Sequence, residues 1–398
     1  MDMKKIFALL LPLFVLVGCN NGTNTTSSVI SSTTSNTQVT SSTTSSSSST
    51  STFTGTPKTL YGIAPIFDDP LGIYDKDPSV IVEGDKQYVF YTTNEVENVS
   101  GDVIAMRVGT KQGDKYVYSD AKICLRPSEN GWDSVRVSNP DVVKGEFKYQ
   151  GTTYSYLLAY QGNSKVKDKI YEIGFAVSND LENWTKVGDK AVITYSSYAL
   201  GSAYGCGAPS LVSYDQKGKV YCFYTYADAL ITSTRVNYLD CSDLDNILMG
   251  EPSAVSSHGL QDKNADVIFN NADFMIDKGT NTLYVVRDRN PVMTMPATSD
   301  SVQVAKASLD ILTNPFDNKW ELVIPAIDNI ETSVLDGGTE TQEFGWERIY
   351  SPCFVSNSYS VVENATQLQV AFSVSAEGSA TDTSYVYSPA IVLFDVEL

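Results

Sequence analysis

Three aspartates lie in similar short phrases of the sequence. Asp77 begins DPSVI, Asp141 is the third residue of NPDVV, and Asp273 is the second residue of ADFMI. Carboxyl groups can act as general acids and bases when their surroundings give them different pKa values. Asp next to Pro is also common where a strand or turn begins, so a structural role is the alternative for Asp77 and for Asp141 taken alone.

The phrase recurs along the chain, which indicates a repeated architecture. It begins at Asp77, Asn139, Ala208, Ala272 and Ser351, and a run rich in aromatic and β-branched residues follows each time. Turns such as QKGK and KGTN separate the phrase from that run, as they do in hairpins. The spacing of roughly 60–80 residues suits four-stranded units arranged around an axis. We expect an all-β fold, a five-bladed propeller over residues 57–398, with units of 57–135, 136–205, 206–268, 269–345 and 346–398.

The first 56 residues carry targeting features. Lys4 and Lys5 precede an apolar stretch that ends at Gly18-Cys19, which resembles a bacterial lipobox. We expect residues 1–19 to be a lipoprotein signal peptide with Cys19 as the site of lipid attachment; an ordinary secretory signal is the alternative. Residues 20–56 are almost all Ser, Thr and Asn and are expected to form a disordered tether. The predicted location is the bacterial cell surface, lipid-anchored and extracytoplasmic.

Charge and composition restrict the classes of partner. The formal net charge of −19 argues against nucleic acid and against anionic membrane surfaces, so the lipid on Cys19 is the only membrane contact predicted. The five later cysteines match no zinc pattern, and His258 is the single histidine. No cofactor is predicted, but a cation such as calcium on the axis is left open. The folded part is expected to be a monomer.

Three segments resemble the five-bladed β-propeller glycosidases, the clan that contains glycoside hydrolase family 43. They are DPSVI, NPDVV and the run Ile173–Trp184 (IGFAVSNDLENW), and the resemblance covers the chain from residue 57 onward. It implies a glycoside hydrolase, with Asp77 as general base and Asp141 as the aspartate that orients the acid and raises its pKa. Inverting members of such enzymes hold base and acid about 6.5–9.5 Å apart, with a water between them.

The third unit departs from the family's pattern. Its members usually carry a glutamate as general acid just before the Gly-Pro of the third blade, whereas Tyr204–Pro209 contains no acidic residue. Glu347 and Asp273 are the candidate replacements. Glu347 could instead bind a sugar hydroxyl or pair with Arg348, and Asp273 could be a substrate ligand. If no acid replaces the missing one, the chain would be a non-catalytic glycan-binding propeller.

Arginines and tryptophans near the predicted strand starts are candidates for sugar recognition. They are Arg136, Arg287, Arg348, Trp132 and Trp346. The arginines could donate hydrogen bonds to a sugar, and the tryptophans could stack on a pyranose face. The alternative is structural: the arginines pair with the many acids and the tryptophans pack between blades. The predicted partner is therefore a carbohydrate.

Overall fold

The computed structural model describes a folded part made almost entirely of β-strands. The described residues are 60–63, 74–94, 102–113, 115–164, 170–197, 203–262, 265–266, 269–289, 299, 301–327, 348–375 and 387–394. They belong to one compact unit, Gly55–Leu398, and none of their helices is long and apolar enough to cross a membrane. The predicted signal peptide, the tether and Cys19 lie outside the described residues. The all-β class is confirmed.

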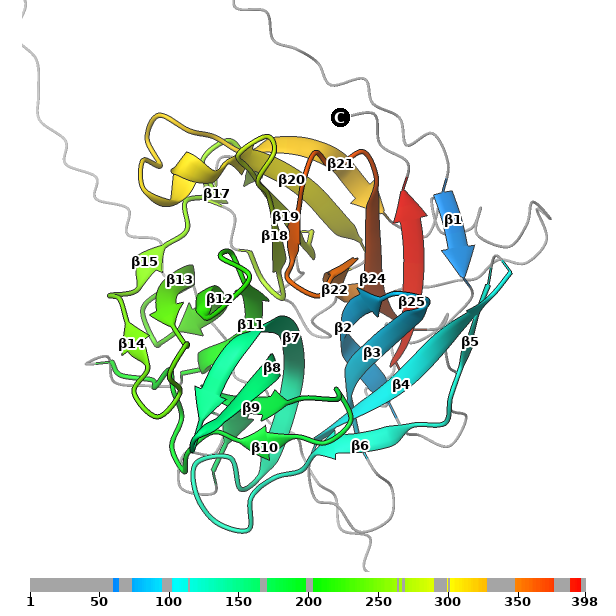
Figure 1. The fold of residues 1–398 in the computed structure, drawn as a ribbon. Helices are drawn as coiled ribbons and strands as arrows, with labels where there is room; N and C mark the ends of the chain where they lie inside the picture. The colour runs from blue at the N-terminus through cyan, green and yellow to red at the C-terminus, as the bar shows by residue number, and fades with distance from the viewer. Residues whose placement is uncertain are drawn as a thin grey trace, which may run out of the picture. The chain divides into compact units, whose positions relative to one another are not determined.

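Within the described ranges the strands fall into five antiparallel units, drawn around a common centre in Figure 1. The first unit contains β2 (Asp75–Glu83), β3 (Lys86–Thr93), β4 (Val103–Gln112), β5 (Lys115–Tyr118) and β6 (Lys122–Leu125). The second contains β7 (Arg136–Tyr149), β8 (Thr152–Asn163), β9 (Glu172–Ser178) and β10 (Thr185–Lys186). The third contains β11 (Gly205–Val212), β12 (Lys219–Ala227), β13 (Thr232–Asp240), β14 (Leu248–Met249) and β15 (Ser253–Ala254).

The last two units follow the same order of strands. The fourth contains β18 (Asp273–Asp277), β19 (Thr282–Asp288), β20 (Val302–Ser308) and β21 (Glu321–Ile327), with a 3-10 turn at Leu309–Leu312. The fifth contains β22 (Arg348–Asn357), β24 (Leu368–Ser375), β25 (Tyr387–Phe394) and β1 (Leu60–Ile63). Three short elements remain: β16 (Gln261–Asp262) and β17 (Ala265–Asp266) pair with each other, and β23 (Val361–Val362) pairs with β18.

The position of β1 corrects the expected boundary of the first unit. Residues 60–63 pair antiparallel with β25, from Leu60 opposite Phe394 to Ile63 opposite Ile391. The N-terminal strand therefore covers the open edge of the last unit, which would otherwise present unpaired backbone groups. Parallel pairing of β2 with β22 then joins the fifth unit to the first.

Neighbouring units share apolar clusters, because alternate residues of a strand point to opposite faces of its sheet. Val80 packs with Cys353 and Ala371 of the fifth unit, whereas the next residue, Ile81, packs with Leu158 of the second. Comparable clusters lie between the second and third, third and fourth, and fourth and fifth units. The core therefore lies between the sheets, and both faces of each inner strand are buried.

The start of each first strand has the same backbone conformation. One residue there has a positive φ: Asp77 (54°), Asn139 (48°), Ala208 (48°), Asn271 (43°) and Ser351 (51°). In every unit but the fourth, the pairing with the second strand shifts register at this point, as at a β-bulge. Positive φ is uncommon for residues other than glycine, so its recurrence marks a constraint on these five strand-start residues. In the fourth unit the equivalent residue is Asn271, one position before the Ala272 that the sequence phrase suggested.

Four of the five strand-start residues are held by the unit before them, all but Asn271. The backbone N–H of each of the four donates to a polar side chain near the end of the preceding unit's second strand. The four recorded pairs are Asp77 N to Ser373 Oγ (3.0 Å), Asn139 N to Thr92 Oγ1 (2.8 Å), Ala208 N to Gln161 Oε1 (2.8 Å) and Ser351 N to Asp288 Oδ1 (2.7 Å). These hydrogen bonds fix the strand starts relative to one another.

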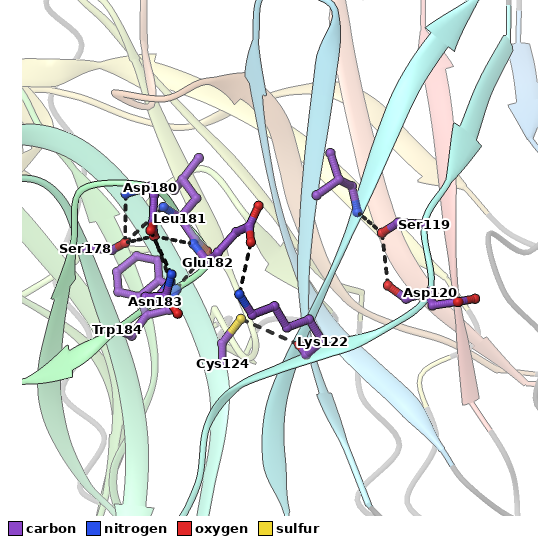
Figure 2. Close-up of polar contacts among 11 residues, drawn as sticks. Ser119, Asp120, Lys122, Cys124, Ser178, Asp180, Leu181, Glu182, Asn183 and Trp184 are labelled. Atoms are coloured by element: carbon purple, nitrogen blue, oxygen red, sulfur yellow. Dashed lines mark hydrogen bonds and ion pairs between the residues drawn. The ribbon is translucent and has the colours of Figure 1, made fainter.

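The third segment of the family resemblance, Ile173–Trp184, consists of β9 and the turn that follows it, and the turn is drawn in Figure 2. Asp180 accepts hydrogen bonds from Asn183 and Glu182, which lower its pKa to about 2. Trp184 Nε1 donates to the carbonyl of Leu181 at 2.9 Å, and the indole meets Phe90 of the first unit edge-on. This tryptophan packs between the first and second units.

The link between β22 and β24 covers the end of the inner strands opposite the strand-start residues. Three consecutive carbonyl oxygens of this link accept backbone hydrogen bonds. The Ser358 oxygen accepts from Lys144 N (2.5 Å), the Tyr359 oxygen from Ser213 N (3.0 Å) and the Ser360 oxygen from Ile276 N (3.0 Å). These donors belong to the second, third and fourth units. Backbone from the fifth unit thus crosses this end of the inner strands.

Asp277 anchors this link, and its replacement should destabilise the fold. The buried carboxylate accepts from the N–H groups of Gly279, Asn364 and Ala365 at 2.8–2.9 Å. Burial opposes its ionisation, but these donors outweigh burial and hold the pKa of Asp277 below its ordinary value. We expect Asp277→Asn to lower the free energy of unfolding by about 3 kcal/mol in urea denaturation, because a charge-assisted hydrogen bond contributes more than a neutral one. The exposed Asp120→Asn is the control; equal midpoints for the two variants would contradict the anchoring role.

Candidate active site

The five strand-start residues line one pocket. Every unit contributes to its wall. The lining residues are Asp77, Pro78, Asn139, Pro140, Asp141, Ala208, Pro209, Asn271, Ala272, Asp273, Ser351, Pro352 and Cys353. The structure therefore brings together three of the predicted catalytic residues: Asp77, Asp141 and Asp273.

Asp77 is the one acidic residue among the five strand-start positions. Its side chain is buried, and Tyr350 OH donates to Oδ1 at 2.7 Å. Lys76 Nζ lies 3.1 Å from Oδ2, yet Oδ2 accepts no hydrogen bond within the described part of the chain. One oxygen is thus fixed by a hydrogen bond, and the other is buried beside the ammonium group of Lys76.

A set of polar side chains, the polar cluster, adjoins Asp77. It consists of Tyr74, Lys76, Asp102, Arg136, Tyr171, Tyr204 and Tyr350. Tyr74 OH donates to Asp102, Arg136 Nη1 donates to Tyr171 OH at 3.3 Å, and the rings of Tyr171 and Tyr204 lie 5.2 Å apart. All members except Asp102 are half-buried, so they reach both the interior and solvent.

The charges in this cluster depend on one another. Burial alone would lower the pKa of Lys76, but the negative charge of Asp77 outweighs it and holds that pKa well above the ordinary value. Lys76 therefore stays protonated beside the Asp77 carboxylate. Arg136 is the one member of the polar cluster that the sequence pattern indicated. The other members belong to no motif that would have marked them as candidates.

Asp141 and Asp273 lie two residues beyond the strand-start residues of their units, so neither is the equivalent of Asp77. Ser79 Oγ donates to Asp141 Oδ1 at 2.8 Å, and Leu211 N donates to Oδ2 at 2.5 Å. The Asp141 carboxylate thereby connects the first, second and third units, so it has a structural role apart from any catalytic one.

Asp273 repeats this arrangement in the next units. Ser210 Oγ donates to its Oδ1 at 2.6 Å and Phe354 N to its Oδ2 at 2.7 Å, which connects the third, fourth and fifth units. Burial raises the pKa of Asp273 to about 6. Burial, and then the charge of Asp273, raise the pKa of Asp141 well above its ordinary value. The Asp141–Asp273 pair therefore carries fewer than two negative charges near neutral pH.

Asp288 is a further buried carboxylate that the sequence pattern did not single out, although its neighbour Arg287 was a candidate. It accepts from Ser351 N at 2.7 Å and from Asn271 Nδ2 at 2.9 Å. Burial, with a smaller contribution from the charge of Asp77, raises its pKa to about 7. The residues at the corresponding positions of other units, Ser373, Thr92 and Gln161, are neutral acceptors.

The third unit has no acid where the resemblance places one. A Cβ on Gly207 would collide with Gln161 Oε1 and with the Tyr204 hydroxyl. Tyr204 OH donates to that same Gln161 oxygen at 2.8 Å. A neutral hydrogen-bonded pair therefore occupies the space beside Gly207.

The predicted sugar-binding residues lie in different parts of the structure. Arg136 belongs to the polar cluster. Arg287 is buried and donates to Gln303 Oε1 at 2.5 Å, outside the pocket lining, and Trp132 stacks on Tyr160 with ring centroids 5.4 Å apart. Glu347, Trp346 and the side chain of Arg348 lie outside the described residues.

The described residues offer no ready metal site. They contain no group of three or more His, Cys, Asp or Glu placed to hold a metal ion. His258 is exposed, and its Nδ1 lies 3.0 Å from the carbonyl oxygen of Asn318. An axial cation stays a prediction from the sequence, and no chemistry is derived from one.

Comparison with solved structures identifies the fold. The chain is similar to a family 117 glycoside hydrolase of the marine bacterium Zobellia galactanivorans, at 14% identity over 85% of this chain and 91% of that one, with a TM-score of 0.53. It is also similar to the catalytic domain of the family 62 α-L-arabinofuranosidase of Coprinopsis cinerea, at 13% identity over 84% and 96%, with a TM-score of 0.55. The Podospora anserina α-L-arabinofuranosidase solved with cellotriose matches at 10% identity over 85% and 97%, also at 0.55.

No protein-family profile and no curated protein matches the sequence. The shared feature is therefore the fold, and the predicted likeness to the propeller glycosidase clan is confirmed at that level.

The raised pKa of Asp288 predicts a pH-dependent contribution to stability. Folding raises this pKa from 3.8 to about 7, so between these values the folded chain binds more protons than the unfolded chain. That contribution is complete below about pH 4 and is lost as the pH rises through about 7. Asp288→Asn removes the titration, so we expect its Tm relative to wild type to rise across this window in a thermal-denaturation series. Asp120→Asn should show a constant difference; a constant difference for Asp288→Asn as well would contradict the assigned pKa.

Proposed function

We propose that the protein is a glycoside hydrolase that acts on oligo- or polysaccharides at the cell surface and inverts the anomeric configuration. The observation that carries the proposal is the buried Asp77 carboxylate in the lining of the central pocket, with Oδ1 held by Tyr350 and Oδ2 beside Lys76 but without a hydrogen-bond partner among the described residues. In this proposal Asp77 is the general base. The fold shared with glycosidases and the polar cluster around Asp77 support it.

Glu347 is the proposed general acid, ahead of Asp273. Both oxygens of Asp273 already accept hydrogen bonds that connect units, so protonating a leaving group would compete with the fold. Glu347 directly precedes β22, the strand that carries Tyr350 and Ser351 to Asp77 and the pocket. Asp141 is proposed to influence proton affinity near the axis through its charge, while it links three units.

A non-catalytic glycan-binding protein is the second candidate. The observation in its favour is the third unit, where Gln161 and Tyr204 fill the space beside Gly207 and no acid is present. The polar cluster would then bind a sugar without cleaving it. Retained glycan binding with no turnover on any substrate would select this candidate.

Replacing Asp77 tests the catalytic proposal. Asp77→Asn keeps the shape of the side chain and can still accept from Tyr350, but it cannot take a proton from water. We expect kcat/KM on a cleaved aryl glycoside or oligosaccharide to fall by about 10²–10⁴, the usual contribution of a general base. Proton NMR of the first product should show inverted anomeric configuration.

The control for this experiment is Asp120→Asn, which removes an exposed carboxylate far from the pocket lining. It should turn over substrate at the wild-type rate. Unchanged turnover in Asp77→Asn, or a product of retained configuration, would contradict the role of Asp77.

The proposed surface location is tested at Cys19. The wild-type chain should incorporate labelled palmitate and fractionate with membranes, whereas Cys19→Ala should incorporate none. A single acyl chain binds membranes only weakly, and stable anchoring needs more than one, as a lipoprotein cysteine carries. Membrane association of Cys19→Ala equal to that of wild type would overturn the lipid-anchor proposal.

A further inference from the structure

Arg136 and Asn163 form a pair of buried polar side chains that lack the partners they require. They lie opposite each other in the register of β7 and β8, so their side chains share one face of the second sheet. Asn163 is 1% exposed, and neither its Oδ1 nor its Nδ2 has a hydrogen-bond partner among the described residues. Arg136 Nε is buried and unpartnered in the same way.

Arg136 has no direct ion pair among the described residues. Its one recorded hydrogen bond goes to the neutral hydroxyl of Tyr171, and none of the ion pairs recorded for the described chain includes it. Lys76, the other cation of the polar cluster, is already paired with Asp77. A half-buried guanidinium without a direct ion pair and a buried unpaired amide each cost free energy, which a ligand with acceptor oxygens would recover.

The position of Arg136 connects it with the proposed site. Its guanidinium interacts electrostatically with Asp102 and Tyr74, which border Lys76 and Asp77. Arg136 thus belongs to the same charged cluster as Asp77, although neither Arg136 nor Asn163 lines the pocket itself. The planar N–H fork of arginine matches the two oxygens of a carboxylate, and an amide N–H beside it can donate to the same group.

We infer that Arg136 and Asn163 form a subsite for an anionic sugar group, so that the glycan recognised at the Asp77 pocket is an acidic one carrying a carboxylate. This inference rests on the proposed function, because it names the substrate class of the same site. The net charge of −19 repels polyanions at a distance, so short uronic-acid oligosaccharides suit the subsite better than long acidic chains.

The test is calorimetric titration with a galacturonic or glucuronic acid disaccharide and with the neutral disaccharide of the same linkage. At an ionic strength of about 0.15 M, screening restricts long-range repulsion to about 8 Å. Wild type should bind the acidic disaccharide about tenfold or more tightly than the neutral one, the effect of one charge-assisted contact. A sulfated neutral disaccharide, run beside them, should bind less tightly than the carboxylate.

Two variants separate a charge effect from a folding effect. Arg136→Gln should lose the preference for the acidic disaccharide while its affinity for the neutral one changes little. Asn163→Asp is nearly isosteric and supplies a carboxylate that pairs with Arg136, so it should fold and also lose the preference. Lys122→Gln should keep the preference for the acidic disaccharide. It removes an exposed positive charge of the first unit, where Lys122 forms an ion pair with Glu182 (Figure 2).

Equal affinity of wild type for the acidic and neutral disaccharides would overturn the inference, as would a preserved preference in both Arg136→Gln and Asn163→Asp or tighter binding of the sulfated sugar. Turnover of neutral glycosides that depends on Asp77, combined with no acidic preference, would overturn this inference and leave the proposed function standing. Failure to bind or cleave any glycan would overturn both.

Discussion

The pocket depends on one repeated interaction between neighbouring units. A polar side chain near the end of one unit's second strand accepts the backbone N–H of the next unit's strand-start residue, as Gln161 does for Ala208. The strand-start residues have a positive φ, which costs residues with a side chain roughly 1–2 kcal/mol, and the hydrogen bond offsets part of that cost. Because the same bend recurs around the inner strands, residues distant in sequence line one pocket.

This repeated frame lets single positions differ in chemistry without a change of backbone. Among the strand-start residues, only Asp77 is acidic, while Asn139, Ala208, Asn271 and Ser351 are neutral. Among the acceptors, only Asp288 carries a carboxyl. The acidic exceptions in the two sets influence each other electrostatically, since the charge of Asp77 contributes to the raised pKa of Asp288.

The sequence was sufficient to predict what depends on local pattern. The recurring phrases are the inner strands, the aromatic runs are the second strands, and Asp77, Asp141 and Asp273 do meet at one pocket. The phrases could not show that Asp141 and Asp273 lie two residues past the bend and connect units, because proline, aspartate and serine exchange places among them. Nor could they reveal Asp288, Tyr350 or Lys76 beside Asp77, because closure of the units brings those residues together. The position of β1 beside β25 was missed for the same reason.

The central claim is that the Asp77 pocket binds and turns over a sugar. A crystal structure of Asp77→Asn with an oligosaccharide that the wild type cleaves tests it most directly. We expect a sugar ring against the strand-start residues, with its anomeric carbon facing residue 77 across one water and Tyr350 still hydrogen-bonded to that side chain. An oligosaccharide bound elsewhere, or one whose glycosidic bond lies out of reach of residue 77, would contradict it.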